Sequence, residues 1–221
     1  MRLIGISGRA GAGKDTVAKM LQYLTLSDYS YTRTNQLSYN QWLQINEVTN
    51  SKTFQDYTIK DISDWQIIRF ADKVKDIVCT LIDCTRGDLE KEEFKTKNVL
   101  CGYSPRQLLQ LVGTDFGRNV IHKDIWVNLT FRNYDEYSKW LISDVRFKNE
   151  LEIIQKNKGI VIRVIRPELE SMDQHESEVN LKDNDDIYDY VIYNDGNINS
   201  LLEEVAKLYQ TLETDLLGRL S

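Results

Sequence analysis

The stretch Gly8-Arg9-Ala10-Gly11-Ala12-Gly13-Lys14-Asp15-Thr16 decides the fold of this chain. It follows the apolar residues 3–6 and precedes a helical pattern over residues 16–24, which gives a strand, a glycine-rich turn and a helix. Such a turn points successive backbone N–H groups into one concavity, and the helix N-terminus adds the positive end of its dipole. Phosphate oxygens bind there, and Lys14 can reach the β- and γ-phosphates of a nucleoside triphosphate. The spacing G-x-x-x-x-G-K is met in full, with Asp15 where Ser or Thr usually follows the lysine and with Thr16 one place later.

Composition and charge narrow the class of protein. The chain has 221 residues, of which 41% are hydrophobic and 28% charged, as in ordinary globular proteins. Its formal net charge of −6 argues against non-specific binding of nucleic acid, which requires a basic face. No apolar run approaches the length that spans a membrane, and the N-terminus lacks the layout of a signal peptide. We therefore expect a cytoplasmic protein whose three cysteines, Cys79, Cys84 and Cys101, are reduced thiols.

Strand and helix signals alternate along the chain. Strands are predicted over residues 2–6, 65–70, 140–144, 159–165 and 189–193, and helices over residues 15–26, 71–82, 90–100, 104–112, 124–137, 147–156 and 198–212. Because the strands are apolar and alternate with helices, the sequence predicts an α/β fold of three layers, with a central parallel sheet between helices. Residues 27–64 are polar and weakly periodic, so we interpret them as an insert in a single domain over residues 1–221.

A second chemical feature lies at the end of the predicted strand 140–144. Asp144 is its last residue, and open parallel sheets bind ligands at the carboxyl ends of their strands. A carboxylate there can hold Mg²⁺ beside the phosphate loop, directly or through water. Arg146 follows, and a guanidinium near a transferring phosphoryl group stabilises developing charge. The plainer interpretation is a capping aspartate and a surface arginine. The presence of the phosphate loop favours the functional interpretation of Asp144 and Arg146.

Other basic residues allow a second anionic ligand. Lys75, Arg106, Arg118 and Arg166 follow strands or lie near helix starts, where arginine can clamp a phosphate with two hydrogen bonds. Each of them alone fits a solvated surface charge equally well. Trp126 can stack on a base, and packing in a core explains it about as well.

Motifs in chain order resemble the deoxynucleoside monophosphate kinases of bacteriophages. The similar segments are the loop with its Lys14-Asp15-Thr16, Phe70-Ala71-Asp72-Lys73-Val74-Lys75, Glu92-Glu93-Phe94-Lys95, Arg106 with Leu111-Val112-Gly113-Thr114-Asp115, Trp126-Val127, Ser143-Asp144-Val145-Arg146 with Glu150, Val164-Ile165-Arg166-Pro167, His175 with Glu178, and Asn194-Asp195-Gly196. They extend from the first strand to the last helix, and only the insert has no counterpart. The ordered set is far more specific than the loop motif alone.

This resemblance implies a P-loop NTPase fold with a helical acceptor-binding part and a short lid over residues 166–185. It implies Mg²⁺-assisted transfer of phosphate from ATP to a deoxynucleoside monophosphate. The ATP phosphates would be held by Gly8, Ala10, Gly11, Ala12, Gly13, Lys14, Asp15 and Thr16, with Asp15 and Thr16 near the metal. Catalysis would rest on Lys14, Asp144, Arg146 and Arg166. The acceptor would be bound by Lys75, Arg106, Gly113, Thr114, Trp126, Asp144, Arg146, Glu150, His175 and Glu178.

Three alternatives stay open. Animal-type phosphomevalonate kinases share the loop style, the S-D-x-R strand end and an E-S-E segment like residues 176–178, but carry basic and serine residues where this chain has Gly11-Ala12. Dephospho-coenzyme A and adenylate kinases usually have Ser or Gly after the lysine and an arginine-rich lid. A non-enzymatic nucleotide-binding switch needs no small acceptor, although the N-K-x-D motif of GTPases is missing. We expect small molecules as partners, without nucleic acid or membrane, and a homodimer stays open.

Overall fold

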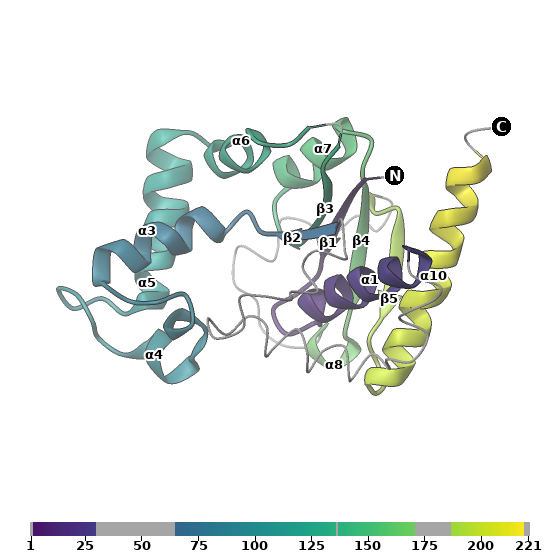
Figure 1. Cartoon of the computed structure of the whole chain (residues 1–221). Coiled ribbons are helices and arrows are strands. Elements are labelled where there is room, and N and C mark those ends of the chain that lie inside the picture. The colour runs from purple at the N-terminus through teal and green to yellow at the C-terminus, as the bar shows by residue number, and fades with distance from the viewer. Residues whose placement is uncertain (1, 30–64, 136, 171–186, 219–221) are drawn as a thin grey trace. The chain divides into compact units, whose positions relative to one another are not determined.

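The computed structural model describes residues 2–29, 65–135, 137–170 and 187–218. The chain divides into two compact units, of which unit 1 comprises residues 1–67 and 137–221 and unit 2 comprises residues 68–136 (Figure 1). Each unit has its own cluster of buried apolar side chains. Most of the predicted insert, residues 30–64, lies outside the described residues.

A five-stranded sheet forms the centre of unit 1. Its strands are β1 (Leu3–Ser7), β2 (Trp65–Ile68), β3 (Lys139–Val145), β4 (Ile160–Ile165) and β5 (Tyr190–Tyr193). Their order is β2-β3-β1-β4-β5, and β1 pairs in parallel with both β3 and β4, while β4 pairs in parallel with β5. The predicted α/β fold with a central parallel sheet is confirmed, and the strand that enters the glycine-rich loop is the middle one.

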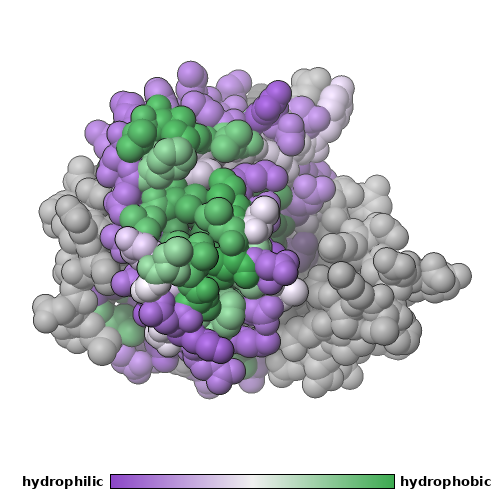
Figure 2. Space-filling model, turned by 90° about the vertical axis from the view of Figure 1, so that its left-hand side faces the viewer, coloured by the Kyte–Doolittle hydropathy of each residue, from purple (hydrophilic) through white to green (hydrophobic). Residues whose placement is uncertain are grey.

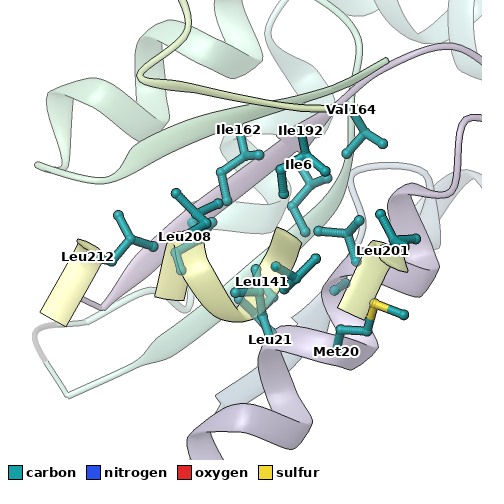
Figure 3. Packing of buried hydrophobic residues seen from close by; sticks show 14 of the residues in the cluster. Ile6, Met20, Leu21, Leu141, Ile162, Val164, Ile192, Leu201, Leu208 and Leu212 are labelled. Carbon is teal, nitrogen blue, oxygen red and sulfur yellow. The ribbon is translucent and has the colours of Figure 1, made fainter. Parts of the chain in front are cut away.

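Helices cover both faces of this sheet because successive side chains of a strand point to opposite faces. Ile4 and Ile6 of β1 belong to the cluster built with α1 (Lys14–Tyr29) and α10 (Ile198–Gly218), which is seen from close by in Figure 3. Gly5, between them, faces α7 (Lys148–Lys156), since a Cβ at Gly5 would lie 2.6 Å from a methyl group of Ile154. The three predicted layers are therefore α1 with α10, the sheet, and α7.

Unit 2 is built from short helices. They are α3 (Asp72–Ile82), the 3-10 helix η2 (Asp88–Glu90), α4 (Glu92–Thr96), α5 (Pro105–Gln110), the π-helix η3 (Leu111–Ile121) and α6 (Ile125–Phe131). Val78, Leu89 and Leu108 form their buried core. The predicted start of α5 is confirmed, because Ser104 caps it and exchanges hydrogen bonds with Gln107 in a capping box.

The helices of unit 2 differ from the predicted ones around η3. Gln110 ends α5, and the chain continues as a π-helix in which the N–H of His122 donates to the carbonyl of Gly117. The indole of Trp126 packs against this helix: its Nε1 donates to the carbonyl oxygen of Gly113 (2.6 Å), and a Cβ at Gly117 would lie 2.5 Å from its ring. Of the helix predicted over residues 90–100, only α4 forms, preceded by the short η2. Helix α6 ends at Phe131 instead of residue 137.

Apolar side chains gather on one surface of unit 2 (Figure 2). Ile77 and Leu81 on α3 are exposed, and so are Phe116, Val120 and Ile121 on η3. Ile77 and Leu81 are four residues apart, as are Phe116 and Val120, which is the spacing of one helix face, and Ile121 follows Val120 directly. No helix among the described residues has both the length and the apolar character needed to cross a bilayer.

Candidate nucleotide-phosphate site

The glycine-rich loop joins the carboxyl end of β1 to the start of α1. Gly8 has a φ of +147° and lies so close to β4 that a Cβ there would be 2.4 Å from the carbonyl oxygen of Val164. Gly13 has a φ of +101°, which L-residues with a side chain rarely adopt. Ala12 donates its N–H to the carbonyl of Arg9 (3.1 Å) and tightens the turn. Both motif glycines are therefore required by the backbone itself.

Lys14 is the first residue of α1, and its side chain returns over the loop. Its Nζ donates to the carbonyl oxygens of Gly8 (2.6 Å) and Arg9 (2.7 Å), and the residue is buried. The first N–H groups of α1 have no partner within the helix and join the same positive region. Loop, ammonium and helix N-terminus thus form one positively polarised surface inside unit 1.

Asp15 is tied to the sheet. Its Oδ1 accepts a hydrogen bond from the hydroxyl of Ser143 on β3 (2.7 Å), and that serine is buried. Thr16 follows on α1 and is half-buried. Among the described residues no three His, Cys, Asp or Glu side chains cluster in the way a protein-only metal cage needs. An exposed carboxylate and a hydroxyl beside a phosphate loop do fit Mg²⁺, which keeps several waters and needs few protein oxygens.

The turn from β3 to α7 presents Arg146. The buried carboxylate of Glu150 accepts hydrogen bonds from the backbone N–H groups of Arg146 (2.8 Å) and Phe147 (3.1 Å), which caps α7 and fixes the turn. Asp144 precedes this turn at the end of β3, the strand next to β1. The guanidinium of Arg146 is exposed and makes no ion pair within the described part of the chain. Glu150, predicted to be a substrate ligand, has a structural role in this turn.

The segment after β4 begins at Arg166 and packs on the loop. Arg166 is exposed and pairs with Glu168 (3.3 Å). In the short helix α8 (Pro167–Glu170), the carbonyl of Leu169 accepts a hydrogen bond from the guanidinium of Arg9, whose side chain is buried. The rest of the predicted lid, including His175 and Glu178, lies outside the described residues.

In unit 2, two predicted acceptor ligands are cations held by carboxylates. The Nζ of Lys75 lies 2.6 Å from Oε1 of Glu90, and the Nη2 of Arg106 lies 2.9 Å from Oε2 of Glu92. Partial burial opposes ionisation of Glu90, but the hydrogen bond and charge of Lys75 prevail and lower its pKa. The hydrogen bond from Lys95, with a smaller contribution from Arg106, lowers the pKa of Glu92. Both carboxylates are therefore anions at neutral pH.

The other predicted acceptor ligands of unit 2 surround Trp126. Gly113 and Thr114 lie half-buried on η3, and Trp126 is 4% exposed, with its indole N–H on Gly113. The indole is thus a core element of unit 2, and its predicted stacking on a base stays a prediction.

The predicted site residues divide between the two units. The loop, Asp15, Asp144, Arg146 and Arg166 belong to unit 1, and Lys75, Arg106, Gly113, Thr114 and Trp126 belong to unit 2. Three residues that contact or form the loop are not among the predicted site residues: Arg9, Ser143 and Asn194. Ser143 and Asn194 belong to motifs that carry the family resemblance, but the sequence assigns them no role. The side chain of Arg9 has no local signal, because its partner Leu169 is 160 residues away.

A parallel sheet with a glycine-rich loop after its middle strand and a lysine turned onto that loop defines a P-loop nucleotide-binding protein. The family model for deoxynucleotide monophosphate kinase matches residues 43–205. The chain therefore belongs to the deoxynucleotide monophosphate kinase family. The loop itself precedes the matched residues.

Individual relatives agree with this family. A putative deoxynucleotide monophosphate kinase of Acanthamoeba polyphaga mimivirus is 34% identical over 47% of this chain and 60% of its own length. The deoxynucleotide monophosphate kinase of Escherichia phage RB69 is 32% identical over 50% of this chain and 47% of its own. The deoxynucleoside-5'-monophosphate kinase of Escherichia phage T5 is 26% identical over 72% of this chain and 73% of its own length. The chain thus spans about half to three fifths of the first two relatives.

Proposed function

We propose that this chain transfers the γ-phosphoryl group of ATP to a deoxynucleoside monophosphate, giving ADP and the diphosphate. The observation that carries the proposal is the buried ammonium of Lys14, which two loop carbonyls hold at the N-terminus of α1. The family of the chain supports the choice of a monophosphate acceptor.

The residues of unit 1 supply binding and charge. The loop N–H groups and Lys14 hold the phosphate chain of ATP, and the exposed guanidinium of Arg146 stabilises the charge that develops on the transferring group. The attacking oxygen of a monophosphate is already largely ionised at neutral pH, so no strong general base is required. Positioning and charge neutralisation then account for the rate.

Mg²⁺ would be held by Asp15, Thr16 and Asp144 with water and phosphate oxygens, where it neutralises phosphate charge. Ser143 orients the carboxylate of Asp15 by donating to its Oδ1. The test of this assignment is the Mg²⁺ concentration that half-saturates the rate, which Asp15→Asn should raise.

Lys75 and Arg106 are proposed to clamp the acceptor's phosphate. In the ligand-free protein their charges are neutralised by Glu90 and Glu92. A phosphate with two negative charges competes for both cations, because the Arg106 pair is exposed and the Lys75 pair is partly exposed. Thr114 and Trp126 are proposed to contact the rest of the acceptor. Arg166 and the segment after it are proposed to close over the nucleotides and exclude water from the reacting groups. The reaction is proposed to take place in the cytoplasm, where the substrates occur.

The direct experiment is a panel of ribo- and deoxynucleoside monophosphates and phosphomevalonate, each incubated with ATP and Mg²⁺. Chromatography then separates diphosphate products from ADP. At least one deoxynucleoside monophosphate should be converted far faster than phosphomevalonate. Equal or faster use of phosphomevalonate would overturn the acceptor, and ADP release independent of any acceptor would overturn the kinase assignment.

A further inference from the structure

Asn194, the residue directly after β5, contacts the phosphate loop. Its Nδ2 donates to the carbonyl oxygen of Ala12 (2.9 Å), 182 positions earlier in the chain. Its backbone N–H donates to the carbonyl of Ile165 (2.7 Å), which continues the pairing of β5 with β4. The sheet therefore fixes Asn194, and Asn194 in turn fixes one carbonyl of the loop.

This contact determines which way one peptide group of the loop points. In a trans peptide the C=O and the N–H point in opposite directions, so holding the Ala12 carbonyl toward Asn194 turns the N–H of Gly13 away from it. Within the described part of the chain, that N–H donates to no protein oxygen. Gly13 is also the only residue type that fits here, because a Cβ would lie 2.7 Å from Nδ2 of Asn194.

We propose that Asn194 is a positioning residue that locks the Ala12–Gly13 peptide so that the Gly13 N–H is presented to a nucleotide phosphate. The inference rests on the proposed function only in placing a nucleotide at this loop. The alternative role is purely local: Asn194 would close the turn between β5 and α10 and stabilise the fold without affecting phosphate binding.

Binding of ADP, measured by titration calorimetry, separates the two roles. Asn194→Ala removes one donor, and we expect ADP to bind about tenfold more weakly, since a hydrogen bond contributes on the order of one factor of ten. Asn194→Asp keeps the shape but offers only acceptors to the Ala12 carbonyl, so it should bind ADP more weakly still. In wild-type protein with ¹⁵N-labelled glycine, one of the 11 glycine amide signals, Gly13, should move downfield on adding ADP.

A matched control is Asn157→Ala. Asn157 also donates through Nδ2 to a backbone carbonyl, that of Ile153 (2.7 Å), at the end of α7 and away from the loop. This variant should lose stability and keep ADP affinity. The proposal is overturned if Asn194→Ala and Asn194→Asp bind ADP like wild type, or if the Gly13 signal does not respond to ADP. Neither readout involves an acceptor, so a wrong acceptor leaves this test intact.

Discussion

Among the described residues of unit 1, Arg146 has contacts that favour a role in the transition state. Glu150 fixes its backbone, and its guanidinium is exposed. Arg146→Ala should lower kcat by at least about a hundredfold and change the KM for ATP much less, because a contact made in the transition state affects kcat. Asp144→Asn should show the same pattern.

Lys148→Ala is the control for these variants, since Lys148 is exposed on α7 and pairs only weakly with Glu152. Steady-state kinetics with each substrate varied decides the outcome. If Arg146→Ala and Asp144→Asn raise only the KM for ATP, the two residues bind ATP and do not stabilise the transferring group.

Cys84 should be much less reactive than Cys101. Partial burial, the neighbouring thiol of Cys79 (3.7 Å between sulfurs) and nearby aspartates raise the pKa of Cys84 to about 11. The thiolate is the reactive form, so Cys84 stays protonated at neutral pH. At pH 7.5, iodoacetamide should label the exposed Cys101 and leave Cys84 largely unlabelled, as measured by peptide mass spectrometry. Labelling of Cys84 should become fast only as the pH approaches 11. Equal labelling rates in the native protein would contradict this environment.

At the scale of elements, η3 depends on Trp126. Trp126→Phe keeps most of the ring but removes the donor to Gly113, so the free energy of unfolding should fall by about 1 kcal/mol. Trp126→Ala should lower it by about 3–5 kcal/mol. The KM for ATP should stay unchanged in both, while the sequence predicts a higher KM for the acceptor. Urea unfolding and steady-state kinetics measure these quantities, and a Trp126→Ala variant of wild-type stability would disprove the packing role.

Elements with local causes could be predicted from the sequence. The strands follow from apolar runs, α5 follows from Ser104-Pro105, and the loop follows from its own glycines and Lys14. The π-helix could not be predicted, because an indole 13 residues from Gly113 holds it. The contacts of Asn194 with Ala12 and of Arg9 with Leu169 also escape sequence reasoning, since they depend on the order of strands in the sheet.

At the scale of the whole molecule, the predicted ligands divide between the two units. The residues proposed to bind ATP belong to unit 1, while Lys75, Arg106 and Trp126 belong to unit 2. The net charge of −6 is a property of the whole chain and is compatible with a local positive region such as the loop with Lys14. Each unit therefore contributes a separable part of the proposed reaction, which variants in either unit can address.

The most direct test of the proposed reaction measures transfer of labelled γ-phosphate from ATP to a deoxynucleoside monophosphate. The rate is compared between wild type and Lys14→Ala. We expect labelled diphosphate from wild type only when the acceptor is present, and at least about a hundredfold slower transfer by Lys14→Ala. Circular dichroism should show that Lys14→Ala is folded, and Lys19→Ala on the same helix should transfer at the wild-type rate. Near-normal transfer by a folded Lys14→Ala would contradict the kinase assignment.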